Sequence, residues 1–514
     1  MAKGGKRAVE CRLLPAVMAV VSDHHRLAIT TRPALRRAAF AGLRLHRAGE
    51  EGASGNVSCS GEGFGHVASD IARQAGIVNS FCVLHAGLLT ARTMNVVTID
   101  PTQLIRDMAT RARAAARILA RTSSPAKAQA LIAAAQAIRD DAAAILAANA
   151  EDVAAGQAAQ LSPAMIDRLL VDADRLESIA AGVEAVANLR DPAGTIIEEI
   201  FRPNGLKLSR VRVPLGVIGI IYESRPNVTA DAGALCLKSG NAVILRGGSE
   251  ARATSAAIHA AMVRGVVAKG LPADAIQLVP IADRDAVGAM LAAQGLIDII
   301  VPRGGKTLVA RVQADARVPV LAHLDGVCHT YVDKGADLSK ACDIVINAKM
   351  RRTGICGAME TLLIDRAFPH PGSVINALAN QGCELRGSPE VMALDPRVLA
   401  ADESDWGAEY LDKICAVALV DGVAGAAAHI ERYGSAHTEA IVTEDLETAE
   451  AFISAVDSAI VMHNASTQFA DGGEFGLGAE IGIATGRLHA RGPVALEGLT
   501  TYKWVVRGNG QVRP

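Results

Sequence analysis

The feature that most constrains the fold is a regular alternation of short apolar runs and helical patterns between residues 217 and 316. Val217–Tyr222 is a continuous apolar run of strand length, which is typical of a strand buried on both faces. Three more such runs follow it, and a helical pattern comes after each of the four, at residues 229–238, 249–268, 283–294 and 306–316. This alternation predicts a doubly wound parallel sheet.

The residues before this region predict helices and then a hairpin. Apolar positions recur every three or four residues over 106–155 and again over 163–187, which indicates amphipathic helices with a break at 123–125. Residues 195–213 alternate apolar and polar side chains around an Asn204-Gly205 turn. That pattern predicts a β-hairpin whose edge is available to a partner chain.

Composition restricts the class of protein. Half of the residues are hydrophobic and 21% are charged, so a large core is possible and wholesale disorder is excluded. Aromatic residues make up 3%, which favours an α/β protein with Ala-rich helices over an all-β one. Lys and Arg number 52 against 54 Asp and Glu, and this near-neutral balance argues against a nucleic-acid partner.

Cysteine usage and hydropathy indicate the compartment. The nine cysteines form no Cys-x-x-Cys pair, so the sequence indicates neither a disulfide scaffold nor a metal site, and we expect a reducing, cytoplasmic setting. The sequence contains no uninterrupted run of about 20 apolar residues, so we expect no membrane span.

Residues 1–93 differ from the rest of the chain in charge and in hydrophobic pattern. They carry 12 Lys and Arg against 6 Asp and Glu, and a new pattern of long Ala-rich runs begins after Met94. We interpret this segment as upstream translation of a chain that starts at Met94, or as disordered, with a targeting or regulatory extension as the alternative. The apolar run at 13–21 would suit a signal peptide but lacks a persuasive cleavage site.

Two of the predicted strands end in sequences that suit an anion. Gly304, Gly305 and Lys306 open a helix, where free backbone N–H groups and a lysine favour negative charge. Arg246 ends another strand and suits a 2′-phosphorylated ribose. A plain tight turn and a surface arginine are the alternatives, and the usual Gly-x-Gly-x-x-Gly fingerprint is absent.

Cys356 has the most unusual surroundings of the nine thiols. Arg351 and Arg352 precede it and glycines flank it, so we expect positive charge to lower the thiol pKa and space to admit a substrate. A buried structural cysteine is the alternative reading. His429 and His437 each begin a His-x-Glu pair, but the Cys-x-x-Cys of a zinc deaminase is missing, and no metal site is predicted.

In the segments given below, residues 94–514 resemble the gamma-glutamyl phosphate reductases, a branch of the aldehyde dehydrogenase superfamily. The matching segments occur in order along the chain, at residues 213–231, 237–251, 301–306, 351–356, 433–442, 464–472, 475–482 and 488–493. The resemblance implies an α/β, aldehyde dehydrogenase-like fold of two Rossmann-like α/β domains plus an oligomerisation β-hairpin.

The resemblance also implies domain limits. We expect an NADP-binding domain at 94–340 that includes the oligomerisation hairpin 195–213, a catalytic domain at 341–480, and a C-terminal segment at 481–514. Residues 499–506 resemble the family's terminal strand, which pairs with a neighbouring subunit.

The implied reaction is the NADPH-dependent reduction of L-glutamate 5-phosphate to L-glutamate 5-semialdehyde and phosphate in proline biosynthesis. In it, the Cys356 thiolate forms a thioester, while the Asn227 side chain and the Cys356 backbone N–H stabilise the oxyanions. The implied cofactor residues are Arg246, Ser249, Gly304, Gly305, Lys306 and Glu409. The candidates for the substrate phosphate, carboxylate or amino-acid head are Arg225, Arg351, Arg352, Ser466, Thr467, Asp471 and Arg491.

One departure from ordinary aldehyde dehydrogenases supports an acyl phosphate substrate. Those enzymes carry a Glu-Leu-Gly-Gly motif whose Glu activates the hydrolytic water, whereas the matching stretch here, 323–329, has no Glu, although Asp325 lies close by. The resemblance further implies a homo-oligomer in the cytoplasm with a functional link to glutamate 5-kinase. A reductase of another acyl phosphate or acyl-CoA and a non-catalytic NADP-binding scaffold are the alternatives.

Overall fold

The computed structural model describes residues 100–513, so the segment 1–93 that we interpret as upstream translation lies outside the described residues. The first described part is a set of five helices, with a short break at Ser123 as expected. Their bounds are α5 (Pro101–Leu119), α6 (Ser124–Asp140), α7 (Ala142–Ala158), α8 (Pro163–Leu169) and α9 (Ala173–Asn188). The Asp100 and Ser123 side chains accept hydrogen bonds from the first turns of α5 and α6, which fixes where these helices begin.

Two breaks in this helical region were not predicted. Asp141 separates α6 from α7, and residues 170–172 separate α8 from α9. Neither break contains Gly or Pro, so the apolar periodicity alone did not reveal them.

The predicted parallel sheet is confirmed as a four-stranded sheet in the order β5-β4-β3-β6. Its strands are β3 (Val217–Tyr222), β4 (Ala242–Arg246), β5 (Ile276–Leu278) and β6 (Ile299–Arg303). The helices between and after them are α10 (Asn227–Lys238), α11 (Arg252–Ala268), α12 (Asp285–Leu291) and α13 (Lys306–Asp315).

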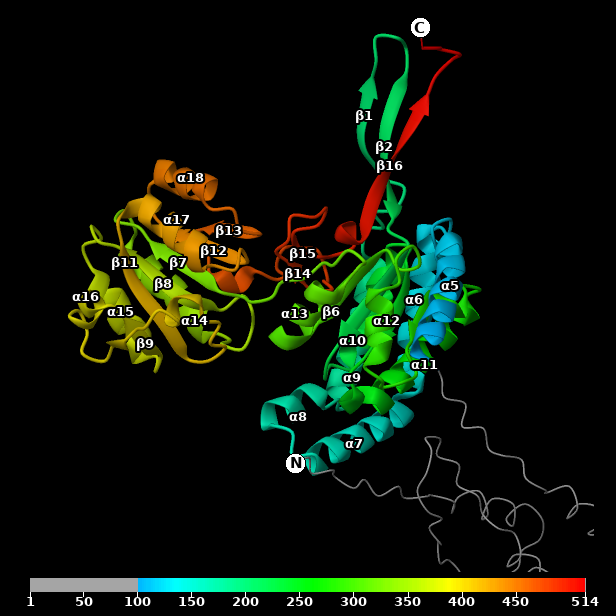
Figure 1. Ribbon diagram of the computed structural model, residues 1–514, viewed down its shortest axis with the longest axis horizontal. Helices are drawn as coiled ribbons and strands as arrows, with labels where there is room; N and C mark the ends of the chain where they lie inside the picture. The colour runs from blue at the N-terminus through cyan, green and yellow to red at the C-terminus, as the bar shows by residue number, and fades with distance from the viewer. Residues whose placement is uncertain (1–99, 514) are drawn as a thin grey trace, which may run out of the picture. The chain divides into compact units, whose positions relative to one another are not determined.

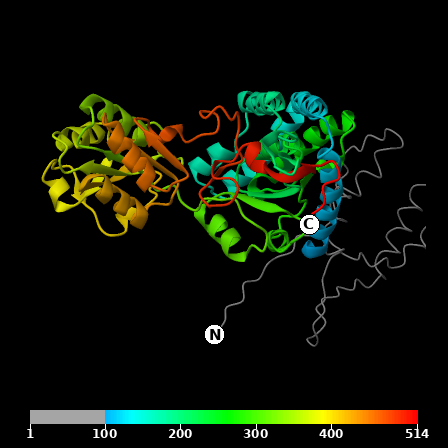
Figure 2. The same cartoon turned by 90° about the horizontal axis from the view of Figure 1, so that it is seen from above.

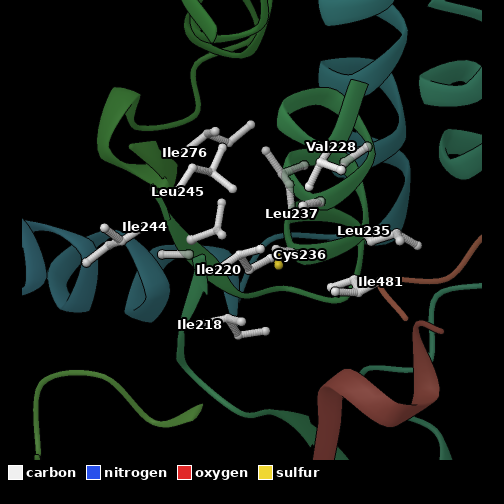
Figure 3. Packing of buried hydrophobic residues seen from close by; sticks show 14 of the residues in the cluster. Ile218, Ile220, Val228, Leu235, Cys236, Leu237, Ile244, Leu245, Ile276 and Ile481 are labelled. Atoms are coloured by element: carbon white, nitrogen blue, oxygen red, sulfur yellow. The ribbon is translucent and has the colours of Figure 1, made fainter. Parts of the chain in front are cut away.

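Buried aliphatic side chains hold this domain together. Figure 3 shows part of this cluster around the sheet and α10, with Ile218, Ile220, Val228, Leu235, Cys236, Leu237, Ile244, Leu245, Ile276 and Ile481 labelled. Ile244 lies on the opposite face of the sheet from Ile220 and Leu245. Ile481 comes from the C-terminal segment, as do the buried Val494, Leu496 and Leu499. The end of the chain therefore completes the core of the four-stranded domain.

The second sheet has seven parallel strands in the order β10-β9-β11-β8-β7-β12-β13. In chain order they are β7 (Cys328–Val332), β8 (Met359–Asp365), β9 (Glu384–Gly387), β10 (Leu399–Ala400), β11 (Ile414–Val420), β12 (Thr438–Val442) and β13 (Ile460–His463). The helices are α14 (Leu338–Met350), α15 (Pro371–Asn380), α16 (Pro389–Met392), α17 (Gly422–Tyr433) and α18 (Leu446–Ala455).

Both faces of this sheet are covered by helices (Figures 1 and 2). Leu362 packs with residues of α14 and α15, whereas its neighbour Leu363 packs with residues of α17 and α18, because successive side chains point to opposite faces of a strand. β7 pairs with β8 and β12, so the seven-stranded sheet already begins at Cys328. The expected boundary near residue 340 is too late, since it would leave β7 in the other domain.

A third sheet is formed by the predicted hairpin and the end of the chain (Figure 1). β1 (Ile196–Phe201) and β2 (Lys207–Pro214) are antiparallel and joined by a turn in which Gly205 has a φ of +86°. β16 (Thr500–Arg507) pairs antiparallel with β2 along its whole length.

The expectation that residues 499–506 pair with a neighbouring subunit stays a prediction; within the chain, β16 pairs with β2. Two contacts explain this. The Asn241 side chain donates to the Leu499 carbonyl, which anchors the start of the strand, and the Arg210 guanidinium lies over the rings of Tyr502 and Trp504.

The remaining elements are short. They are the two-stranded sheet of β14 (Ile483–Ala484) and β15 (Gly492–Pro493), and the 3₁₀ turns η1 (Ser249–Ala251), η2 (Ala273–Ala275), η3 (Asp405–Gly407), η4 (Thr467–Phe469) and η5 (Glu497–Leu499). Within residues 100–513, none of the helices combines the length and the apolar character needed to cross a bilayer.

The close contact of α6 and α11 gives a stability test. A Cβ added to Gly265 of α11 would lie 2.5 Å from the Ala133 backbone, so Gly265→Ala should push the two helices apart and lower the free energy of unfolding by about 1–3 kcal/mol. Gly288 of α12 is the matched control, because a Cβ there meets nothing within 4 Å and Gly288→Ala should be neutral or stabilising. Chemical denaturation of both variants measures the difference, and equal stabilities would contradict the close contact.

Candidate active site

Cys356 lies in the turn between α14 and β8, with its side chain half-buried. Gly326 presses against this turn, since a Cβ at residue 326 would lie 2.3 Å from the Cys356 carbonyl oxygen. The same oxygen accepts a hydrogen bond from the Cys328 thiol at 3.1 Å. The segment that leads into β7 therefore fixes the backbone that carries the nucleophile candidate.

The charge around the thiol differs from the expectation. Burial raises the pKa of Cys356 to about 11, the Arg303 guanidinium acts to lower it, and the carboxylates of Glu480 and Glu409 raise it further. Arg351 and Arg352 are exposed, and the cation that acts most strongly on the sulfur is Arg303. The expected depression of the thiol pKa by these two arginines is wrong, because desolvation outweighs the nearby positive charge.

Two histidines lie beside the sulfur. One nitrogen of His323, one nitrogen of His437 and the Cys356 sulfur are all within 4.8 Å of one another. The His323 and His437 rings meet edge to face with their centroids 5.0 Å apart. His323 is half-buried, whereas His437 is fully buried.

Asn227 begins α10 and is exposed. Its side-chain amide donates to Asp231 Oδ2 at 2.9 Å, one helical turn further on. Burial raises the pKa of Asp231 to about 6. This contact orients the Asn227 amide and leaves its second N–H available.

The cofactor candidates lie at the carboxyl ends of β4 and β6. Arg246 donates to the Ala282 carbonyl, while its Nε is buried with no partner among the described residues. Ser249 is exposed and lines a small pocket with Gly247 and Gly248. A Cβ at Gly247 would lie 3.0 Å from the Tyr222 ring. The turn therefore packs closely against the end of β3, and glycine suits this position.

The start of α13 carries a carboxylate of the chain itself. Glu223 Oε2 accepts a hydrogen bond from the Gly305 N–H at 2.9 Å, and a Cβ at Gly304 would lie 2.4 Å from the same oxygen. Lys306 forms an ion pair with Asp325 at 2.9 Å. The position expected for a pyrophosphate is thus one that attracts an anion, and Glu223 occupies it here.

Glu409 lies in the loop before β11, where Oε1 accepts a hydrogen bond from the Gly326 N–H at 3.0 Å. Burial raises the pKa of this carboxyl. Because Glu409 also raises the pKa of Cys356, it belongs to the electrostatic surroundings of the sulfur.

The substrate candidates fall into two groups. Burial lowers the pKa of the Arg225 guanidinium. The charges of Cys356, Arg303 and Arg352 also affect this pKa, so Arg225 lies near all three. Ser466 and Thr467 are buried at the start of η4, and the Thr467 hydroxyl has no partner among the described residues. These groups surround the cysteine turn, where Arg351 and the Arg352 carbonyl also contact Gln468.

Two candidates are engaged within the chain. All of the hydrogen bonds of the Arg491 guanidinium go to Asp457 and the Thr485 carbonyl, which makes it a structural ion pair in this structure. Asp471 is exposed and accepts from the Gly473 N–H. Its charge raises the pKa of Glu480, which shows that Asp471 lies near the site.

Sequence reasoning missed four groups at this site: Arg303, His323, His437 and Glu480. Arg303, His437 and Glu480 stand in segments that match the family, and His437 also begins a His-x-Glu pair, but no pattern linked these groups or His323 to the sulfur. The assembled site contains a thiol, two uncharged imidazole candidates for proton transfer, an oriented amide and several cations, which suits covalent chemistry on an acyl group.

The chain is similar to known proteins along most of its length. A family model described as "Aldehyde dehydrogenase family" matches residues 90–384. The gamma-glutamyl phosphate reductase of Rhizorhabdus wittichii is 70% identical over 415 residues, which cover 81% of this chain and 97% of the relative. That of Sphingopyxis alaskensis is 68% identical, covering 80% of this chain and 96% of the relative.

Solved structures give the same picture. The crystal structure of a gamma-glutamyl phosphate reductase from Thermotoga maritima matches with a TM-score of 0.78 and 40% identity, covering 80% of this chain and 100% of that one. An acetylating aldehyde dehydrogenase from Geobacillus thermoglucosidasius, with a TM-score of 0.58 and 18% identity, shares the fold. The expected α/β, aldehyde dehydrogenase-like fold is confirmed.

The charge of Arg303 gives a direct test of the site. Because this guanidinium favours the thiolate, Arg303→Gln should raise the pKa of Cys356 and slow its alkylation by iodoacetamide at a fixed pH. Mass spectrometry of the peptide that carries Cys356 measures the rate separately from the other thiols. Arg311→Gln is the matched control, since Arg311 pairs with Asp315 on α13, and equal rates for the two variants would show that Arg303 does not act on the sulfur.

Proposed function

The chain belongs to the gamma-glutamyl phosphate reductase family, a branch of the aldehyde dehydrogenases, and from that premise we propose that it reduces L-glutamate 5-phosphate with NADPH through a Cys356 thioester. The products are L-glutamate 5-semialdehyde and phosphate, and the semialdehyde cyclises to 1-pyrroline-5-carboxylate in proline biosynthesis. The observation that carries this proposal is the juxtaposition of Cys356 with Arg303, His323 and His437 in one turn-lined site.

The covalent step uses the sulfur of Cys356. The sulfur attacks the acyl carbon, the C–O bond to phosphate breaks, and phosphate leaves with the bonding pair and takes up a proton from water. A thioester of Cys356 results. The half-buried setting of the thiol favours this intermediate over hydrolysis, since it limits access of water.

The oxyanion formed in each tetrahedral step needs hydrogen-bond donors. The free N–H of the Asn227 amide and the Cys356 backbone N–H serve this purpose, with Asp231 holding the amide from the next turn of α10. The positive charge of Arg303 adds to the stabilisation of negative charge near the sulfur.

The nicotinamide cofactor supplies the hydride that reduces the thioester. The residues at the end of β4 fit it, because Arg246 has a buried Nε with no partner among the described residues and the Gly247-Gly248 turn lines a small pocket with Ser249. Arg246 and Ser249 favour NADPH over NADH, since a cation and a neutral hydroxyl suit a 2′-phosphate. Gly304, Gly305 and Lys306 would hold the pyrophosphate in the position where Glu223 now accepts the Gly305 N–H, and Glu409 would face the nicotinamide ribose.

Substrate binding draws on the cations and the polar loop around the cysteine turn. Arg225, Arg351 and Arg352 hold the phosphate or the carboxylate. Ser466, Thr467 and Asp471 hold the amino-acid head, and the buried Thr467 hydroxyl has no other partner among the described residues. Arg491 contributes through its ion pair with Asp457, which fixes the segment before β15.

The domain roles, the oligomer and the cellular location that we propose follow from the same family membership. We propose NADP-binding and catalytic domains built on the four-stranded and seven-stranded sheets, a homo-oligomer that uses the β1-β2-β16 sheet, and a cytoplasmic location. The substrate is an acyl phosphate that hydrolyses readily, which accounts for a functional link to a kinase that makes it, glutamate 5-kinase.

The nucleophile and the substrate are tested together. Cys356→Ala should abolish the phosphate-dependent reduction of NADP⁺ by L-glutamate 5-semialdehyde, while binding of NADPH, followed by its fluorescence, survives. Activity that persists in this variant would refute the nucleophile. A panel of other acyl phosphates and acyl-CoA esters tests the substrate, and turnover of one of them without turnover of L-glutamate 5-phosphate would favour another reductase of the superfamily.

The cofactor preference is tested at the end of β4. Arg246→Ala should raise the KM for NADPH much more than the KM for NADH, since only NADPH carries the 2′-phosphate. Arg317→Ala is the control, because Arg317 is an exposed arginine on the segment after α13. A parallel rise of both KM values would show that Arg246 supports the fold rather than the 2′-phosphate.

A further inference from the structure

The sulfur of Cys356 needs a proton acceptor. Burial holds its pKa well above neutrality, so at neutral pH the group is a thiol and not the thiolate that attacks an acyl carbon. The segment that matches the Glu-Leu-Gly-Gly motif has no Glu. Some other group must therefore take the proton when the C–S bond forms.

We propose that His323 is the general base, taking the Cys356 proton on Nε2 as the sulfur attacks. The inference rests on the proposed function and adds to it the residue that takes the proton.

The hydrogen bonding of His323 fixes its proton. Nδ1 lies 2.7 Å from the Ile483 carbonyl oxygen, and a carbonyl oxygen only accepts, so Nδ1 carries the hydrogen in the neutral ring. The lone pair is then on Nε2. Because Nδ1 is engaged by the backbone, Nε2 is the nitrogen left for the cluster within 4.8 Å that contains the Cys356 sulfur.

His437 is the other imidazole in this cluster and is a poorer base. It is fully buried, its Nδ1 lies against the Thr438 hydroxyl at 2.9 Å, and its Nε2 has no partner among the described residues. Burial lowers the pKa of His437 to about 3, which means that its cation is strongly disfavoured. Its edge-to-face contact with His323 instead holds the His323 ring in place.

Burial, the Ile483 carbonyl and two charges act on the His323 pKa. Burial lowers it, the hydrogen bond to the Ile483 carbonyl raises it, Arg303 lowers it, and Asp325, two residues along the chain, raises it. Glu409 and Glu480 each accept a backbone N–H, and among the described residues no carboxylate oxygen joins the cluster. His323 is thus neutral at neutral pH and has a nearby carboxylate to stabilise the imidazolium as it forms.

The proton balance of the cycle is simple. The S–H proton moves to His323 Nε2 as the C–S bond forms, and phosphate leaves with its bonding pair and is protonated by water. After hydride addition to the thioester carbon, the C=O bond re-forms and the C–S bond breaks. The departing sulfur takes the proton back from His323, so the thiol and the neutral imidazole are restored.

The test compares His323→Gln with the wild type. Gln keeps a donor for the Ile483 carbonyl but has no base, so turnover should fall by about 10²–10⁴-fold. His489→Gln is the matched control, since His489 is exposed and also contacts a backbone carbonyl, that of Gly498, at 2.9 Å. It should behave as the wild type.

Alkylation of Cys356 by iodoacetamide gives a readout that a merely structural role would not change. In the wild type the rate should show a plateau around neutral pH, where His323 is neutral and the thiol is protonated. In His323→Gln it should instead rise about tenfold per pH unit toward the thiol pKa, because only free thiolate reacts, and should reach the wild-type rate at alkaline pH. Added imidazole should partly restore turnover to His323→Ala.

The outcomes separate the two proposals. An unchanged alkylation profile and unchanged turnover in His323→Gln would overturn the base and leave the proposed function standing. A wild-type protein that does not reduce L-glutamate 5-phosphate would overturn the proposed function itself. Loss of turnover with an unchanged alkylation profile and no rescue by imidazole would also refute the base, since it would show a structural role for His323.

Discussion

The parallel pairing of β3 with β4 and β6 is the constraint on which the rest of the structure depends. The register places Ile221 opposite Arg246 and Tyr222 opposite Arg303, so three strands end side by side. The loops that follow them carry Asn227, the Gly247-Gly248 turn and the start of α13. A single set of backbone hydrogen bonds thus determines where the amide, the cofactor candidates and the cation nearest the sulfur lie.

The active-site sulfur is held in an environment that opposes its charged form. Burial and two carboxylates disfavour the thiolate, while Arg303 favours it less strongly. A thiol in such a site is protected from adventitious oxidation and alkylation, because the thiolate is the reactive form. The cost is that the proton must be removed during the reaction, and the imidazole of His323 meets that need.

Much of the fold was accessible from the sequence because its signals are local. The apolar run 217–222 and the glycines after two strands are properties of adjacent residues, and the structure has the predicted strands and turns there. The site was less accessible because it depends on contacts between distant segments. Arg351 and Arg352 are sequence neighbours of Cys356 but are exposed, whereas Arg303 and His323 approach the sulfur from elsewhere in the chain. Adjacency in sequence misled us about charge, since the sign of a thiol pKa shift is set by burial as well as by neighbours.

The return of the last strand to β2 has a consequence for how the protein is made. β16 and the buried Leu499 are synthesised after the other members of the sheet and the core that they complete. Until they have left the ribosome, one edge of β2 and part of the apolar surface around Ile481 have no cover. The domain therefore cannot reach its final form before β16 has been made.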